Sequence, residues 1–159
     1  RAALRAAVDA VSTALPETAE LARDVADRAA LRLAGPGHSA TPIHGDFSAD
    51  QVLVAGGELV IIDFDQAELG DPAADLGLFA ANLEADVIGE RLVPARAHAL
   101  SQALMTGYTA AGGRDVHDGL AAATAGWLLR LAPEPFRHRR PDWPERTRGL
   151  LLRARELLR

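Results

Sequence analysis

Residues 42–77 read PIHGDFSADQVLVAGGELVIIDFDQAELGDPAADLG, and this stretch decides the fold at the centre of the chain. Two runs rich in Val, Leu and Ile, Gln51–Ala55 and Glu58–Ile62, are separated only by Gly56-Gly57. A two-residue turn of type I′ requires positive φ at both central positions, which glycine adopts without steric cost. The pattern therefore predicts a β-hairpin with the two glycines at its tip.

Acidic and amide side chains lie next to both strands of this predicted hairpin, on the side away from its tip. Asp46 and Asp50 precede the first run, Gln51 begins it, and Asp63 and Asp65 follow the second. Because a hairpin reverses the chain, we expect all five to converge at its open end. Carboxylates at short range repel one another, and Mg²⁺, which prefers hard oxygen ligands, relieves that repulsion. The alternative interpretation is a solvated acidic loop with turn-forming aspartates.

The rest of the chain shows helical periodicity. Asp71-Pro72 is typical of an N-cap followed by proline at the first helical position, and it begins a predicted helix with an apolar stripe. The four prolines of residues 133–144 predict a loop, and Gly35-Pro36-Gly37 predicts a helix break. Five further helices are predicted at about residues 2–15, 17–33, 95–110, 116–131 and 143–158. We expect a mainly α fold with one small β-hairpin (α+β).

Composition removes several classes of protein. The 159 residues include no cysteine, which excludes disulfide scaffolds, thiolate zinc sites and cysteine nucleophiles. All 17 basic residues are arginine, so the chain contains no Walker-type lysine and no Schiff-base lysine. The formal net charge of −5 argues against nucleic acid as the main partner. No apolar run approaches the ~18 residues of a membrane span, and no signal-peptide pattern opens the chain, so we expect a cytoplasmic protein without a membrane partner.

Three motifs in this stretch resemble a known family. His44-Gly45-Asp46 is followed five residues later by the amide side chain of Gln51, then by the hairpin and Ile62-Asp63-Phe64. The segment 70–77, Gly-Asp-Pro-Ala-Ala-Asp-Leu-Gly, completes the pattern. In this order and spacing the motifs resemble the aminoglycoside phosphotransferase and choline-kinase-like branch of the protein-kinase fold. The resemblance covers the helical C-terminal lobe of that fold only.

The resemblance implies a role for each matching residue. Asp46 corresponds to the catalytic aspartate, and His44 braces the loop by hydrogen bonding. Asp63 corresponds to the principal Mg²⁺ ligand, and Gln51 stands where the family usually has an Asn metal ligand. Asp65 is a candidate second metal contact or points toward the acceptor. The implied reaction moves the γ-phosphoryl group of ATP or GTP onto a hydroxyl of a sugar, an aminoglycoside or a similar acceptor. Asp71 and Asp75 are implied to be structural.

The resemblance also implies a partner for the chain. The family binds its nucleotide between this lobe and a β-rich N-terminal lobe that carries a phosphate-binding lysine. We expect residues 1–159 to form a single lobe, with leading helices over 1–34, the catalytic loop, hairpin and metal aspartate over 43–65, and a helical subdomain over 71–159. The N-terminal nucleotide lobe is absent from these residues. The chain is then either a fragment of a longer enzyme or an orphan lobe.

Two functional alternatives and one charged cluster stay open at this stage. A kinase-like lobe without its nucleotide half is also compatible with a non-catalytic binding or regulatory module. A metal-dependent phosphohydrolase built on the same carboxylates is a further rival. Residues 130–159 hold nine arginines against four acids, and Arg137-His138-Arg139-Arg140 is either a solvated loop or a contact for an anionic or neutral polar acceptor.

Overall fold

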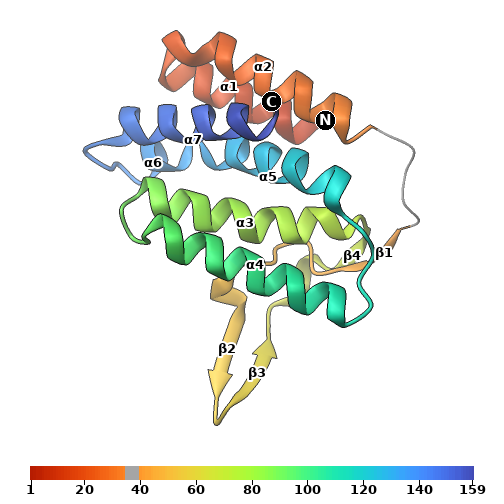
Figure 1. Cartoon of the computed structure of the whole chain (residues 1–159). Coiled ribbons are helices and arrows are strands. Elements are labelled where there is room, and N and C mark those ends of the chain that lie inside the picture. The colour runs from red at the N-terminus through yellow and green to blue at the C-terminus, as the bar shows by residue number, and fades with distance from the viewer. Residues whose placement is uncertain (35–39) are drawn as a thin grey trace.

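A computed structural model describes residues 1–34 and 40–159 of the chain and shows a mainly helical fold with two small strand pairs (Figure 1). The predicted break at Gly35-Pro36-Gly37 lies outside the described residues. The main helices are α1 (Ala2–Ala14), α2 (Ala19–Arg32), α3 (Pro72–Ile88), α4 (Pro94–Ala110), α5 (His117–Leu131) and α7 (Trp143–Leu157). All six correspond to predicted helices, with ends that differ by a few residues.

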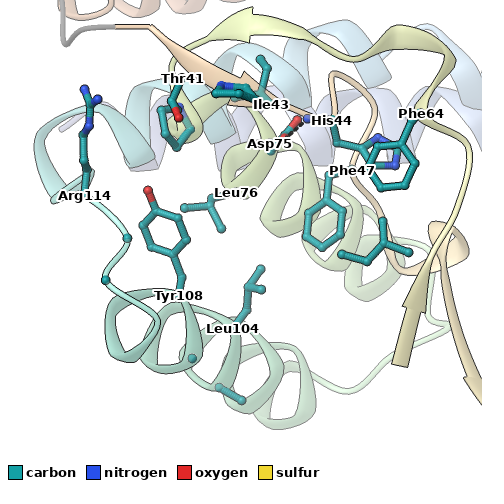
Figure 2. A pocket seen from close by; sticks show the side chains of 17 residues that line it. Thr41, Ile43, His44, Phe47, Phe64, Asp75, Leu76, Leu104, Tyr108 and Arg114 are labelled. Carbon is teal, nitrogen blue, oxygen red and sulfur yellow. Dashed lines mark hydrogen bonds between the residues drawn. The ribbon is translucent and has the colours of Figure 1, made fainter. Parts of the chain in front are cut away.

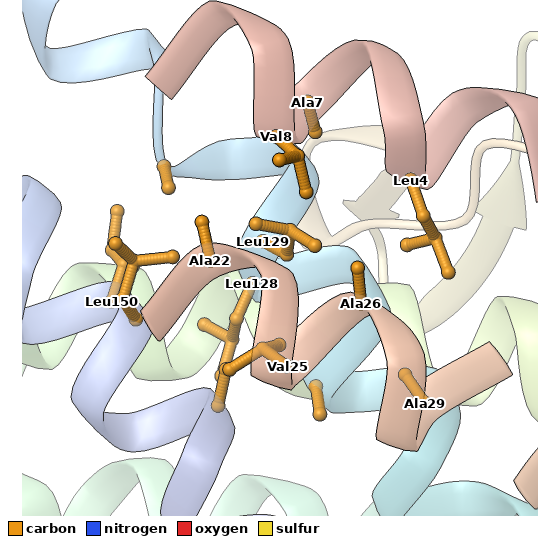
Figure 3. Packing of buried hydrophobic residues seen from close by; sticks show 14 of the residues in the cluster. Leu4, Ala7, Val8, Ala22, Val25, Ala26, Ala29, Leu128, Leu129 and Leu150 are labelled. Carbon is orange, nitrogen blue, oxygen red and sulfur yellow. The ribbon is translucent and has the colours of Figure 1, made fainter. Parts of the chain in front are cut away.

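Helix α5 lies at the centre of the helical stack. It packs against α1 and α2 on one side, against α3 on the other, and alongside α7 (Figure 1). Leu128 and Leu129 of α5 are fully buried among side chains of α1, α2 and α7 (Figure 3). Much of the remaining core is alanine, which lets helix axes approach closely and leaves little room for added volume.

The predicted hairpin is present and projects from the helical body (Figure 1). Strands β2 (Val52–Ala55) and β3 (Glu58–Ile61) pair antiparallel, with Val52 opposite Ile61 and Ala55 opposite Glu58. Gly56 and Gly57 have φ angles of +60° and +86°, so both adopt the positive φ that the turn requires. Most of the hairpin's apolar side chains are exposed to solvent, including Val54 and Leu59.

A second strand pair was not predicted. Strands β1 (Thr41–Ile43) and β4 (Glu68–Gly70) pair antiparallel, with Thr41 opposite Gly70. Each strand has only three residues and β1 contains a proline, so neither shows the alternating pattern that identifies a strand in a sequence. This pair joins the two ends of the segment that contains the catalytic motifs.

The proline-rich segment differs from the prediction as well. Residues 133–144, expected to be a loop, contain the one-turn helix α6 (Glu134–Arg137). Its Pro135 lies in the first turn, where a missing backbone N–H removes no helical hydrogen bond. In residues 1–34 and 40–159, no helix has the length and apolar character needed to cross a lipid bilayer.

Gly77 in α3 provides a test of the close packing between α3 and α5. A Cβ at Gly77 would lie 2.7 Å from Cβ of Ala123 and 2.9 Å from the backbone nitrogen of Thr124. We expect Gly77→Ala to lower the free energy of unfolding by about 1–3 kcal/mol, because the two helices must move apart. Urea denaturation monitored by circular dichroism measures the change.

The matched control is Gly107→Ala in α4, where a Cβ would meet nothing within 4 Å. Alanine favours the helix by up to about 1 kcal/mol over glycine, so this variant should be as stable as the parent or more stable. Equal stability of the two alanine variants would contradict the close α3–α5 contact.

Candidate active site

The catalytic motifs lie in a segment whose two ends are held together by the β1–β4 pair. Residues 44–67 leave this pair, form the hairpin and return to it. Ile43, the last residue of β1, is buried, and its side chain fills the space beside Gly70 where a Cβ would stand 2.5 Å from its Cδ1 atom. The His44-Gly45-Asp46 motif therefore begins at a fixed point of the fold.

The first turn of α3 holds this motif by its backbone. The Asp75 carboxylate accepts hydrogen bonds from the N–H of His44 at 2.6 Å and from the N–H of Gly45 at 2.9 Å. Asp71 caps the same helix by accepting from the N–H of Ala73 at 2.9 Å, as predicted for an N-cap. The start of α3 and the catalytic loop thus form one hydrogen-bonded unit.

His44 connects the loop to the end of the hairpin. Its side chain is buried, and Nε2 lies 2.8 Å from the carbonyl oxygen of Ile62. The N–H of Asp46 donates to Nδ1 at 3.4 Å. This pair of contacts fits the neutral tautomer that carries its proton on Nε2. The geometry is that of a bracing histidine, and it ties Asp46 to Ile62, the residue before Asp63.

Asp63 and Gln51 lie beside each other at the base of the hairpin. The backbone carbonyl oxygen of Gln51 accepts a hydrogen bond from the backbone N–H of Ile62 at 3.0 Å. The side-chain amide nitrogen of Gln51 lies 3.5 Å from Oδ2 of Asp63. Asp63 is exposed and has a left-handed backbone, with φ 65° and ψ 58°. Non-glycine residues adopt this conformation at a cost in free energy, and such residues concentrate at functional sites.

The sequence predicts that four carboxylates converge at the open end of the hairpin. Across the part of the chain that the structure describes, no group of three or more His, Cys, Asp or Glu side chains is placed to hold a metal ion. Asp63 pairs with the Gln51 amide, while Asp46 follows the loop held by His44 and Asp75. A metal role for Asp65 stays a prediction.

An apolar cavity of about 630 Å³ adjoins the loop. The His44 ring contacts Phe64 and Phe47, with ring centroids 4.8 and 5.9 Å apart, and these aromatic rings form one wall. Leu104 and Tyr108 of α4 project from the opposite wall (Figure 2). Asp46 itself does not line this cavity, although its neighbours His44 and Phe47 do.

The basic cluster at residues 137–140 does not line this cavity. It does not line a second cavity near the loop either, which Gly45 and Trp127 help to form. Arg137 and His138 pair with Glu134 of α6, at 2.5 and 3.5 Å. An arginine outside that cluster, Arg130 of α5, does lie near Asp46. Its guanidinium stacks 3.6 Å from the centroid of the Trp127 ring. The spacing of a tryptophan and an arginine on one helical face is visible in the sequence, but the position of that face relative to the loop is not.

The environment of Arg130 changes the pKa of its guanidinium. Partial burial lowers the pKa of its guanidinium, and the negative charge of Asp46 acts in the opposite direction. The residue as a whole is exposed, and its guanidinium lies against the indole of Trp127. Arg130 stays fully charged at neutral pH because an arginine titrates far above it.

A loop that presents a braced aspartate, followed by a hairpin with an amide and a second aspartate at its base, is the arrangement found in phosphoryl-transfer proteins. Residues 1–114 match the model of the phosphotransferase enzyme family. The chain belongs to this family, and its general activity is therefore phosphotransfer. A comparison with curated proteins found no relative that matches.

Gly45 provides a test of the loop's contact with the segment after Asp63. It has φ +84°, and a Cβ there would overlap the carbonyl oxygen of Gln66. Gly57 at the hairpin tip has φ +86° with nothing within 4 Å of its Cβ position. Both alanine variants incur the backbone cost of about 1–2 kcal/mol, and only Gly45→Ala adds the steric overlap. We expect a clearly lower melting temperature for Gly45→Ala than for Gly57→Ala, and equal values would contradict the contact.

Asp75→Asn tests whether the carboxylate holds the loop. An amide has one acceptor oxygen, so one of the two N–H groups would lose its partner and face a donor. The loss of about 1–3 kcal/mol should raise the hydrogen-exchange rates of the His44 and Gly45 amides by roughly tenfold or more. Asp86→Asn, in the same helix, removes only an exposed pair with Arg91 and should leave both rates unchanged. Unaltered exchange in Asp75→Asn would exclude the role.

Proposed function

We propose that the chain provides the catalytic lobe of a Mg²⁺-dependent kinase that moves the γ-phosphoryl group of ATP or GTP onto a hydroxyl of a sugar, an aminoglycoside or a similar small acceptor. The observation that carries the proposal is the placement of Asp46. The aspartate follows a loop held at three points, by Asp75, by the His44 side chain and by the β1–β4 pair. Membership in the phosphotransferase family supports the reaction class.

Asp46 is suited to act on the acceptor hydroxyl. Its backbone N–H is directed to His44, which fixes the start of the side chain and leaves the carboxylate free to accept the hydroxyl proton. Phosphoryl transfer needs little covalent assistance from a protein, so positioning and charge neutralisation supply most of the rate. The catalytic loop is held by Asp75, by the His44 side chain and by the β1–β4 pair, so it can hold Asp46 in one position.

Gln51 and Asp63 fit a magnesium ion by their chemistry. Both offer oxygen atoms, the donor type that Mg²⁺ prefers, and they lie together at the base of the hairpin. The Gln51 amide now presents nitrogen to Asp63, and rotation of the terminal amide exchanges it for oxygen. When bound, the ion would neutralise phosphate oxygens of the nucleotide. Asp65 is the third candidate ligand.

The nucleotide is proposed to bind with help from an additional lobe. The chain has no lysine to contact the phosphates. The exposed apolar side chains of the hairpin, among them Val54 at 74% and Leu59 at 71% exposure, are compatible with cover by another β-rich unit. The partners proposed on this basis are a nucleoside triphosphate, a hydroxylated acceptor and an N-terminal lobe.

The test replaces the two aspartates in the complete protein. Asp46→Asn and Asp63→Asn should each lower nucleotide-dependent phosphorylation of an acceptor panel by roughly 1,000-fold or more, because both the proton acceptor and the metal ligand act on the reacting groups. ADP release measures turnover, and circular dichroism checks that the variants fold. Asp24→Asn, which removes an exposed pair with Arg28, is the control and should retain parental activity.

The non-catalytic alternative makes the opposite prediction. A binding module would show no acceptor-dependent ADP release in the parent protein, and the two aspartate variants would then differ from it in neither activity nor folding. Turnover close to that of the parent in either variant would remove the roles proposed for these carboxylates.

A further inference from the structure

Arg130 and the side chains around it form a second feature of the site, in a cavity distinct from the apolar one. A cavity of about 370 Å³ lies between the start of α1, α5, the start of α3 and the loop. The residues that line it include a second arginine, Arg1, together with Gly45, Gln66, Trp127 and Arg130. Gly45, the residue that precedes Asp46, lines the same cavity as Arg130, which sets the guanidinium beside the catalytic loop. Burial lowers the pKa of Arg130 and the negative charge of Asp46 acts to raise it, which agrees with that placement. The question is what a fixed cation does at this position.

The guanidinium is held in place by its own helix. It lies over the Trp127 ring at 3.6 Å from the centroid, a geometry that restricts its rotation. The Trp127 indole N–H donates to the carbonyl oxygen of Ala74 at 2.9 Å. Ala74 neighbours Asp75, which holds the catalytic loop. One turn of α3 therefore positions both the aspartate loop and the arginine.

The charge of Arg130 interacts with the Trp127 ring and with the negative charge of Asp46. Several other arginines form ion pairs: Arg153 contacts both oxygens of Glu84 at 2.7 and 2.9 Å, Arg146 pairs with Asp142 and Arg148 with Glu17. Within residues 1–34 and 40–159, Arg130 has neither an ion pair nor a hydrogen bond from its guanidinium. Five N–H donors beside a catalytic aspartate are thus available to a ligand.

Guanidinium groups bind oxyanions in pairs of parallel hydrogen bonds, which fixes orientation as well as charge. Two acids, Glu68 and Asp71, also line the cavity, but Asp71 is engaged as the cap of α3. We propose that Arg130 binds an oxyanion beside Asp46, either an oxygen of the transferring phosphoryl group or an anionic substituent of the acceptor. The inference rests on the proposed kinase activity for its role in turnover, whereas binding of the anion is measurable without turnover.

The first experiment measures binding with inorganic phosphate as the probe. The chain has two tryptophans, so its NMR spectrum contains two indole N–H signals, and Trp143→Phe identifies that of Trp127. Phosphate, compared with chloride at equal ionic strength, should shift the Trp127 signal in a saturable way and leave the Trp143 signal in place. Arg130→Gln should abolish the shift. Arg28→Gln on the surface of α2 is the control and should preserve it.

The second experiment distinguishes the two sources of the anion in the complete protein. Glucose and gluconate serve as a neutral and an anionic acceptor of similar size. A fall of roughly 100-fold in kcat/KM for both acceptors in Arg130→Gln assigns the contact to the phosphoryl group, and a fall with gluconate alone assigns it to the acceptor. Arg130→Lys keeps the positive charge but loses the two parallel donors of the guanidinium, so it should be more active than Arg130→Gln and less active than the parent.

The outcomes separate the two hypotheses. A saturable, Arg130-dependent phosphate shift without any acceptor-dependent ADP release supports the anion site and rejects the proposed kinase activity. Turnover that Arg130→Gln leaves unchanged, together with a phosphate shift that is absent or survives in that variant, overturns the role of Arg130.

Discussion

The carboxylate of Asp75 determines where the catalytic loop lies. It is half-buried in the first turn of α3 and accepts two backbone N–H groups that precede Asp46. Hydrogen bonds to a charged group contribute about 1.5–3 kcal/mol each, which is large compared with the other contacts of this loop. Any shift of α3 would therefore move the loop with it. The start of α3 is itself fixed, because Asp71 caps the helix and Pro72 occupies its first turn.

The position of Arg130 depends on α3 as well, through the packing of α5. Its buried residues set its depth in the core, and the hydrogen bond from Trp127 to Ala74 sets its position along α3. Arg130 is placed by these two constraints. Asp46, the Gln51–Asp63 pair and Arg130 come from three different parts of the chain, yet each is positioned by contacts with α3, with the loop that α3 holds, or with the hairpin that this loop leads into. The rigidity of the site is thus a property of helix packing as much as of the loop.

Local patterns in the sequence predicted most of the fold. The two glycines of the hairpin tip, the Asp71-Pro72 helix start and the periodicity of six helices each reflect the conformational preference of a few adjacent residues. The β1–β4 pair was missed because three-residue strands carry no pattern of their own, and α6 was missed because its proline signals a loop equally well. The gathering of four carboxylates was expected from the hairpin topology and from a metal ion that would relieve their repulsion, and within residues 1–34 and 40–159 no three acidic or histidine side chains form a metal-holding group. Arg130 was missed because its place depends on how α5 is rotated against α3, and no short stretch of sequence determines that.

The β1–β4 pair has a consequence for how this region tolerates change in length. Two three-residue strands fix both ends of the segment from His44 to Ala67, while an added Cβ at Gly56 or Gly57 of the tip would meet no atom within 4 Å in residues 1–34 and 40–159. Each doubling of a loop whose ends are fixed costs only about 0.6 kcal/mol. Insertions at the tip are therefore tolerated without displacing Gln51 or Asp63 at the base. Evolution is free to lengthen or shorten this arm, and so to alter what it can reach, while the chemistry below it stays in place.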